Sequence, residues 1–480
     1  MPSAATPAHL LGLGLRLVIG ALLSACGDGG PPDGPRSVLL ITCDTLRADR
    51  LGLYGHSGGT SPNLDALARE ALVFDSAWST APITGPALSA LLTGRMPEEL
   101  GLDSNRTLLA SAATTLAERL AEAGVETAAI VSNWVLRRRS ELPDAGVQQG
   151  FAHFDDRMEV AEKSRPNLKE RLAPATTDAA LAWLDERTDG RPLFLWVHFQ
   201  DPHGPYTAPL DCLVEPASDG AAEPELTPGA DQVGHGTLPA YQVVDDERRP
   251  AVYRARYEAE IRFFDRELGR LIDGLRARGW LERALLVFTA DHGESLGEHG
   301  YYFSHGQNLH KELLRVPLFL RPPGGAEAPR RSSATASHLD LYSTILHALG
   351  LEPGPTRGLD LLAGEPPAER VLPQFLRGAW GATGARYRLI AEKGRRQVFD
   401  HAADPAELHD LAASHPELAR SLAEGHQAFV RRLAPAALGA VRAPLDEGAE
   451  NALDALGYGG EQRDDALKND AGQDDAGDDH

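Results

Sequence analysis

Three separated stretches of the chain each end an apolar run on an acidic or hydroxyl side chain. SVLLITCD ends at Asp44, STAPITGPALSALLTGR surrounds Thr84, and LLVFTADHGE contains Asp291 and His292. Two carboxylates and an imidazole can bind a divalent cation. A hydroxyl beside such a cation can lose its proton and attack an ester. The pattern therefore predicts a hydrolytic enzyme that acts on an anionic ester.

Thr84 lies where a helix is expected to begin. Thr84-Gly85-Pro86 precedes ALSALLTG, which favours a helix that ends at Gly94, and proline is tolerated in a first helical turn. Free N–H groups and the positive end of the helix dipole favour an anion at such a position. An alkoxide on Thr84 and the oxygens of a bound sulfate or phosphate would both be stabilised there. A threonine that only caps the helix is the alternative interpretation.

Histidines gather near the third stretch. Asp291-His292 is followed by Glu298-His299 and then by His305. A single histidine of this kind is more often solvated or packed in a core. The cluster as a whole indicates a functional site.

Four short apolar runs rich in Val, Ile, Leu and Phe are typical of strands buried on both faces of a parallel sheet. The runs are Ser37–Cys43, Thr127–Val131, Leu193–Phe199 and Ala284–Thr289. In open α/β sheets the site lies at the carboxyl ends of the strands. Polar residues follow all four runs: Asp44, then Ser132 and Asn133, then Asp201 and His203, then Asp291 and His292.

Helices are expected between these strands, which gives an α/β fold with a large, mostly parallel sheet flanked by helices. Further segments predict a strand and a hairpin, and a small C-terminal α+β subdomain is expected over 351–435, after a catalytic domain over 37–350. The expected helices are Pro62–Val73, Thr115–Ala123, Val252–Arg278, Ser337–Leu349 and Pro416–Leu433, the strand is Pro317–Arg321, and the hairpin pairs Arg386–Glu392 with Arg396–Asp400.

The ends of the chain differ in character from its middle. An apolar run from Leu10 to Leu23 leads into Leu-Ser-Ala-Cys, which predicts a signal peptide over 1–26 that ends in a lipobox, with lipid on Cys26. A signal peptide cleaved nearby without lipidation is the alternative. Residues 27–36 are expected to form a tether, and the acidic stretch 446–480 a disordered tail. We therefore expect an exported lipoprotein, anchored to a membrane of the bacterial cell envelope or periplasm.

The net charge of −22 argues against a nucleic-acid partner, which requires a basic face. Three cysteines imply no disulfide framework, although a bridge between Cys43 and Cys212 stays open. The sequence does not indicate an oligomeric state.

An ordered series of motifs carries a family resemblance. DTLRADRLGLYGH, TSPNLDALAREALVF, LLTGRMP, HFQDPHGPY, FTADHGESLGEHG, LLRVPLFLRPPG and DPAELHDLA occur between Val38 and about Leu433. With these motifs the chain resembles the sulfatase family of the alkaline phosphatase superfamily. The resemblance implies an alkaline-phosphatase-like fold, a divalent metal and an anionic ester substrate.

The same resemblance suggests roles for individual residues. It places the metal ligands at Asp44, Asp291 and His292, and the nucleophile at Thr84, which would also contact the metal. His203 matches a histidine that contacts the ester or leaving group, and His305 matches a basic substrate-binding residue. Asn105 and Asn133 are further candidates for substrate binding.

Two departures from the family pattern affect the chemistry. Many sulfatases carry Cys or Ser in a C/S-x-P-S-R motif, where that residue is oxidised to formylglycine, whereas here Thr84-Gly85-Pro86-Ala87-Leu88 stands in its place. Threonine cannot become formylglycine, so none is expected. Thr45 replaces a further Asp ligand, and His292 an Asn common in calcium sites. Imidazole with carboxylates favours Mn, Zn or Mg, with Ca still open.

Several functions stay open at this stage. The leading hypothesis is hydrolysis of sulfate or phosphate esters through Thr84, with the phosphoester favoured on mechanism. The alternatives are a true sulfuric ester hydrolase, a transferase that moves a phospho-alcohol head group onto an envelope glycan, and an inactive binding lipoprotein. The substrate is not readable, although the long Cys212–Pro250 segment is a candidate for specificity.

Overall fold

A computed structural model describes residues 37–163, 169–188, 190–216, 223–229, 234–433 and 440–442. The predicted signal peptide with Cys26, the tether and the acidic tail lie outside these residues. Among the residues described, no helix combines the length and the apolar character that crossing a membrane requires. Cys43 and Cys212 are both free thiols, so the bridge left open by the sequence is not formed.

A mixed sheet forms the centre of the described chain. Its nine strands run in the order β14-β2-β15-β11-β1-β8-β4-β5, with β16 paired to β2. The pairings along β11-β1-β8-β4-β5 are all parallel, whereas β15 pairs antiparallel to both β11 and β2. Their bounds are β1 (Ser37–Cys43), β2 (Leu72–Trp78), β4 (Glu126–Val131), β5 (His153–Asp155), β8 (Leu193–Phe199), β11 (Ala284–Ala290), β14 (Arg315–Val316), β15 (Leu318–Arg321) and β16 (Arg330–Ser337).

The four strands predicted from apolar runs are β1, β4, β8 and β11, and they are neighbours in the sheet. Every residue of β1, β8 and β11 is buried. Helices cover both faces, which explains why these strands contain no alternating polar residues. The expected α/β fold is confirmed.

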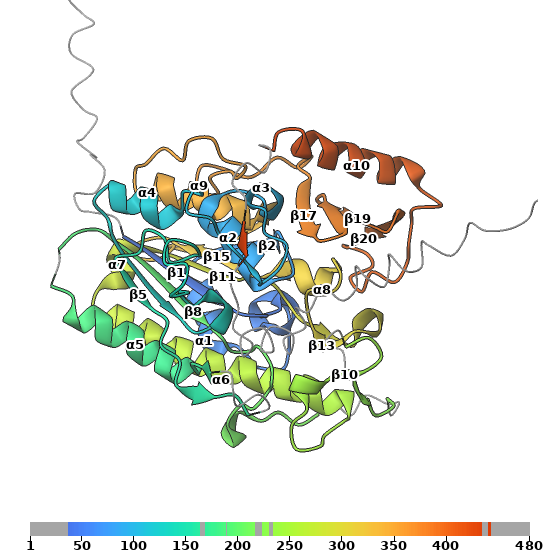
Figure 1. Ribbon diagram of the computed structural model, residues 1–480, viewed down its shortest axis with the longest axis horizontal. Helices are drawn as coiled ribbons and strands as arrows, with labels where there is room; N and C mark the ends of the chain where they lie inside the picture. The colour runs from blue at the N-terminus through green and yellow to red at the C-terminus, as the bar shows by residue number, and fades with distance from the viewer. Residues whose placement is uncertain are drawn as a thin grey trace, which may run out of the picture. The chain divides into compact units, whose positions relative to one another are not determined.

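Two layers of helices enclose the sheet (Figure 1). One layer contains α1 (Pro62–Ala68), α5 (Ala173–Glu186), α6 (Pro250–Ala277) and α7 (Trp280–Arg283). The other contains α2 (Thr84–Thr93), α3 (Pro97–Leu100), α4 (Leu116–Glu122) and α9 (His338–Ala348). Thr115 and Ser337 cap α4 and α9 with reciprocal side-chain bonds, which fixes where these helices begin.

One predicted helix was too long. The segment Pro62–Val73 was expected to be helical throughout, but α1 ends at Ala68 and Leu72 begins strand β2. Strand β2 pairs with β14, β15 and β16. These partners come from a distant part of the chain, so tertiary pairing overrides the local helical pattern.

A second, antiparallel sheet follows in the C-terminal part. It contains β17 (Leu372–Leu376), β18 (Ala379–Thr383), β19 (Tyr387–Glu392) and β20 (Arg395–Asp400), with α10 (Pro416–Val430) packed on it (Figure 1). The predicted hairpin is β19–β20, whereas β17 and β18 were not anticipated. The boundary between the two predicted domains stays a prediction. A short helix, α8 (Lys311–Leu314), lies directly before β14 along the chain.

Small two-stranded sheets complete the described elements. They are β3 (Thr107–Leu108) with β21 (Val441–Arg442), β6 (Val160–Ala161) with β7 (Lys169–Glu170), β9 (Pro228–Gly229) with β10 (Leu238–Pro239), and β12 (Ser295–Leu296) with β13 (Tyr302–Ser304).

Candidate active site

The carboxyl ends of β1 and β11 bring the three predicted metal ligands together. Asp44 follows β1, and Asp291 and His292 follow β11, the parallel neighbour of β1. The Nε2 atom of His292 lies 3.9 Å from Asp44 Oδ1 and 3.4 Å from Asp291 Oδ2. All three side chains are fully buried. Their ligand atoms converge closely enough to hold one metal ion.

The hydrogen bonds of the two carboxylates leave room for a cation. Asp291 Oδ1 accepts bonds from the backbone N–H groups of Thr45, at 3.1 Å, and His292, at 2.7 Å. Within the described chain, Asp44 Oδ1 and Asp291 Oδ2 are buried without a hydrogen-bond partner. Buried carboxylate oxygens without partners are costly unless a positive charge meets them. The residues therefore fit a divalent cation.

The electrostatics of the two carboxylates differ. Burial and the charge of Asp291 raise the pKa of Asp44 well above its usual range, against the effect of a hydrogen bond from Asn133. Burial also acts to raise the pKa of Asp291, but His292, His198 and two backbone N–H donors outweigh it and lower that pKa. Two buried acids this close repel each other when both are ionised, and a bound cation relieves that repulsion.

The tautomer of His292 suits a metal ligand. Its Nδ1 atom lies 2.9 Å from the carbonyl oxygen of Gly293. A carbonyl only accepts, so Nδ1 carries the proton and the lone pair of Nε2 faces the carboxylates. A side chain on Gly293 would collide with the backbone of Glu312, because a Cβ there would lie 2.0 Å from that carbonyl oxygen. Glycine at this position keeps the turn after the ligands narrow.

Thr84 lies beside the predicted ligands. Its Oγ1 atom is 3.3 Å from His292 Nε2, and its side chain is buried. Ile83 occupies the capping position of α2, so the alternative that Thr84 merely caps this helix is wrong. Gly85 donates its N–H to Asn105 Oδ1 at 2.8 Å. The first turn of α2 therefore presents a hydroxyl, not a capping group, to the carboxylates and the imidazole.

The two predicted substrate-binding asparagines occupy different environments. Asn133 donates from Nδ2 to Asp44 Oδ2 and accepts from the N–H of Val135 at 2.8 Å. It therefore orients a candidate ligand. Asn105 holds Gly85, and its Nδ2 atom is buried without a hydrogen-bond partner in the described chain. A donor of that kind is available for an oxygen of a bound ester.

The two histidines that the resemblance assigned to the ester, His203 and His305, form a row of rings with His292. The ring of His305 lies 4.6 Å from that of His292 and 5.1 Å from that of His203, between centroids. His203 Nδ1 lies 2.7 Å from the carbonyl oxygen of Gly204, which directs Nε2 away from the backbone. The structure thus brings both histidines to the site that the sequence indicated.

Sequence reasoning missed the carboxyl group that supports His305. Glu294 is fully buried, and its Oε1 lies 3.0 Å from His305 Nδ1, while Tyr206 donates to its Oε2 at 3.2 Å. Burial raises the pKa of Glu294 to about 8, against the opposing effect of His292. The Asp-His-Gly-Glu motif contains this residue, but only the hairpin β12–β13 brings His305 back to it.

Thr45 was noted only as a departure from the family pattern, yet its conformation shapes the site. It has φ 56° and so occupies the left-handed region, which is strained for a β-branched residue. Tyr257 donates to its carbonyl oxygen at 2.7 Å. This backbone turn aims the N–H of Thr45 at Asp291, so the strain serves ligand placement.

Comparisons with known proteins agree with this geometry. The profile of the Sulfatase family matches residues 36–351. A choline-sulfatase of Rhizobium meliloti is 27% identical over 426 residues, which cover 80% of this chain and 82% of the relative. A multifunctional alkaline phosphatase superfamily protein, PehA of Trinickia caryophylli, is 26% identical over 386 residues, covering 66% and 74% of the two chains.

Solved structures show the same fold. The phosphonate monoester hydrolase of Agrobacterium radiobacter has a TM-score of 0.68 at 21% identity, and the match covers 83% of this chain and 96% of that one. The family profile spans well over half of the sequence. The chain belongs to the sulfatase family of the alkaline phosphatase superfamily and is a hydrolase of sulfuric or phosphoric esters.

Proposed function

We propose that the chain cleaves phosphoric esters with Thr84 as nucleophile and a divalent metal held by Asp44, Asp291 and His292. The supporting observation is the position of Thr84 Oγ1, 3.3 Å from His292 Nε2 at the edge of a buried pair of carboxylates. A metal bound there would act as a Lewis acid that favours ionisation of a hydroxyl and polarises an ester oxygen. Mn, Zn and Mg suit this donor set better than Ca.

The residues of the chain supply the remaining steps. Thr84 Oγ1 releases its proton to solvent and forms a bond to the central phosphorus. The bond from phosphorus to the alcohol oxygen breaks, and that oxygen takes a proton from His203 or His305. Asn105 Nδ2, which has no hydrogen-bond partner in the described chain, would donate to an oxygen of the ester. Water then attacks the phosphorus of the Thr84 ester and gives a proton back to the histidine. The bond from phosphorus to Oγ1 breaks, Oγ1 takes a proton from solvent, and phosphate leaves.

The nucleophile favours phosphorus over sulfur. The β-carbon of threonine carries one oxygen and a methyl group, so it cannot be oxidised to the aldehyde of formylglycine. An ester formed on Thr84 is therefore released by attack of water at the central atom. This route is the one expected of a phosphoenzyme intermediate. The choline-sulfatase among the relatives keeps a sulfuric ester as the competing substrate class.

Substitutions at position 84 test this proposal. Thr84→Val keeps the shape of the side chain but removes the hydroxyl, and turnover should fall by at least about 1,000-fold. Thr84→Ser keeps a hydroxyl and should retain turnover within about tenfold of the parent. Substrates would be an aryl phosphate monoester, a bis-aryl phosphate diester and an aryl sulfate, each at saturating Mn, Zn or Ca.

The outcomes separate the alternatives. Full turnover by Thr84→Val would exclude Thr84 as the nucleophile. Hydrolysis of the aryl sulfate that is faster than that of both phosphates, and lost in Thr84→Val, would assign a sulfuric ester instead. Transfer of a head group to a glycan acceptor in place of water would assign a transferase.

We also propose that this activity resides in the cell envelope, with the chain held by lipid on Cys26. The support is the Leu-Ser-Ala-Cys sequence that follows an apolar run. Incorporation of radiolabelled palmitate should occur in the full chain and be lost in Cys26→Ala. Labelling that persists in this variant would refute the anchor.

A further inference from the structure

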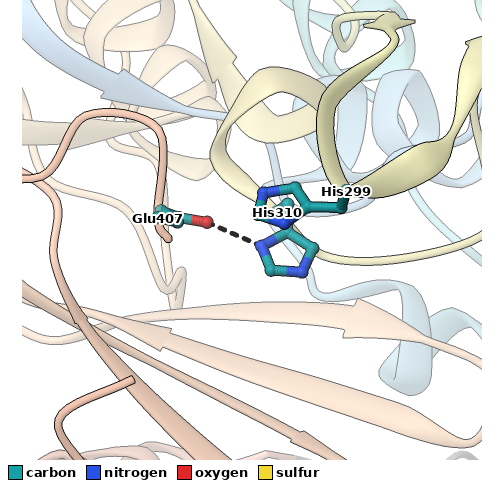
Figure 2. A group of neighbouring side chains, drawn as sticks. All are labelled: His299, His310 and Glu407. Atoms are coloured by element: carbon teal, nitrogen blue, oxygen red, sulfur yellow. Dashed lines mark hydrogen bonds and ion pairs between the residues drawn. The ribbon is translucent and has the colours of Figure 1, made fainter. Parts of the chain in front are cut away.

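A second group of metal-ligating side chains lies outside the active site. His299 belongs to the 3₁₀ turn Glu298–Gly300, His310 precedes α8, and Glu407 follows β20 in the C-terminal part. One ligand atom from each residue lies within 4.8 Å of the others. Figure 2 shows the three side chains, with the two imidazoles face to face and the carboxylate at their edge.

Glu407 and His310 already share one hydrogen bond. His310 Nδ1 lies 2.9 Å from Glu407 Oε2, which also accepts the N–H of Lys311 at 3.1 Å (Figure 2). The Nε2 atom of His299 is buried and has no hydrogen-bond partner in the described chain. The two rings are 3.6 Å apart between centroids, at an angle of 13°. Two stacked imidazoles, one of which has an unused ring nitrogen, do not complete a hydrogen-bonded network by themselves.

A fourth side chain points to a ligand independently. The Glu312 side chain is only 6% exposed, and its Oε2 lies 3.9 Å from His299 Nε2. Its Oε1 is buried without a hydrogen-bond partner in the described chain. A carboxylate buried to this extent beside an unpaired imidazole nitrogen is costly unless a cation lies between them.

Other residues hold the carboxylate in place. The fully buried Arg388 pairs with Glu407 Oε1 and donates to the carbonyl oxygen of Leu309 at 2.7 Å. Glu407 Oε2 thus faces the imidazoles while Oε1 stays with the guanidinium. Metal sites commonly use a ligand carboxylate whose other oxygen is held by a hydrogen-bond donor of this kind.

We propose that His299, His310 and Glu407 form a second binding site for a divalent transition metal, with the Glu312 carboxylate beside His299. Zinc is the best match to imidazole nitrogens and carboxylate oxygens. The cation takes the place of the proton between His310 Nδ1 and Glu407 Oε2, and that proton moves to Nε2 of the same ring. One of the two stacked rings must turn so that both nitrogen lone pairs meet the ion.

The position of this site suggests what it does. Glu407 comes from the C-terminal part, whereas His299 and His310 flank the segment that carries His305 into the active site. Arg47 ties the same segment further, by donating to the carbonyl of Glu294 at 3.0 Å and pairing with Glu298 at 2.8 Å. A metal here would clamp the His305 segment to the C-terminal sheet without touching substrate.

Metal content tests the proposal on the full chain. After loading with zinc and gel filtration, the parent should hold about two equivalents, and Asp291→Asn and His299→Ala about one each. The double variant should hold almost none. His347→Ala is the matched control, because His347 also pairs with an acid, Asp360 at 3.1 Å, and should keep the parental content. Parental zinc content in His299→Ala would overturn the second site.

Cobalt gives a second measurement that does not require His299→Ala to fold. Asp291→Asn disables only the first site, so cobalt added to this variant should still produce visible d–d bands from the second. Adding His310→Ala to that background should abolish them. An Asp291→Asn chain without cobalt bands would refute the proposal. The inference does not depend on the proposed catalysis, because loss of one zinc in His299→Ala is expected whether or not Thr84 is the nucleophile.

Discussion

Replacing Asn133 tests whether this residue binds the substrate or positions the metal ligand Asp44. The sequence suggested that it contacts the ester, whereas the structure places its Nδ2 on Asp44 Oδ2 and its Oδ1 on the N–H of Val135. Asn133→Ala should therefore weaken metal binding more than substrate binding. Loss of such an outer contact typically lowers metal affinity by about 10- to 100-fold.

That range corresponds to about 1.4–2.7 kcal/mol, or one to two factors of ten in the dissociation constant. Asn133→Asp should exceed it, because a carboxylate in this buried position repels Asp44 instead of donating to it. Competition with a chromophoric chelator would give the metal Kd, and turnover at saturating metal would give kcat and KM separately. A raised KM at saturating metal, with an unchanged metal Kd, would refute the positioning role and restore the role in substrate binding.

Three further outcomes are expected. Arg388→Ala strands the buried Glu407 carboxylate and should destabilise the chain by about 3–5 kcal/mol in urea unfolding. Arg386→Ala removes an exposed pair and should leave the free energy of unfolding nearly unchanged. Burial raises the pKa of Glu98 to about 7. The stability that the protonated Glu98 side chain contributes is fully present below its unfolded pKa of about 4.3 and is lost as pH rises through about 7. Glu98→Gln should therefore raise the free energy of unfolding at about pH 8 and leave it unchanged at about pH 4. A chelator should lower the melting temperature, since metal at 100 times its Kd contributes about 2.7 kcal/mol; an unchanged melting temperature would contradict metal binding.

The sequence was most informative where local pattern and chemistry coincide. Runs buried on both faces have no polar alternation, so β1, β8 and β11 could be read directly, within a residue of their observed bounds. Parallel strands end at one edge of a sheet, so the sequence predicted Asp44 and Asp291 at that common edge, and the structure pairs their strands β1 and β11 as direct neighbours. The start of helix α2 at Thr84 was predicted from Gly85 and Pro86, which follow Thr84 in the sequence.

The residues that were missed depend on contacts between distant segments. Strand β2 exists because β14, β15 and β16 pair with it, and nothing within Leu72–Trp78 specifies those partners. Glu294 belongs to the Asp-His-Gly-Glu motif, but it contacts His305 only because the hairpin β12–β13 folds His305 back beside it. Tyr206 is likewise linked to the site only through Glu294.

The site and the fold depend on each other because the metal ligands lie in the core of the sheet. The strands that carry Asp44 and Asp291 are buried along their whole length, so the ligands cannot separate without breaking the core. Bringing two carboxylates together there opposes folding, because each loses its water and repels the other. The chain offsets this cost in part with Asn133 and with backbone N–H donors, one of which requires the strained turn at Thr45. A cation would supply the remainder, so the arrangement that destabilises the metal-free chain is also the one that selects a metal.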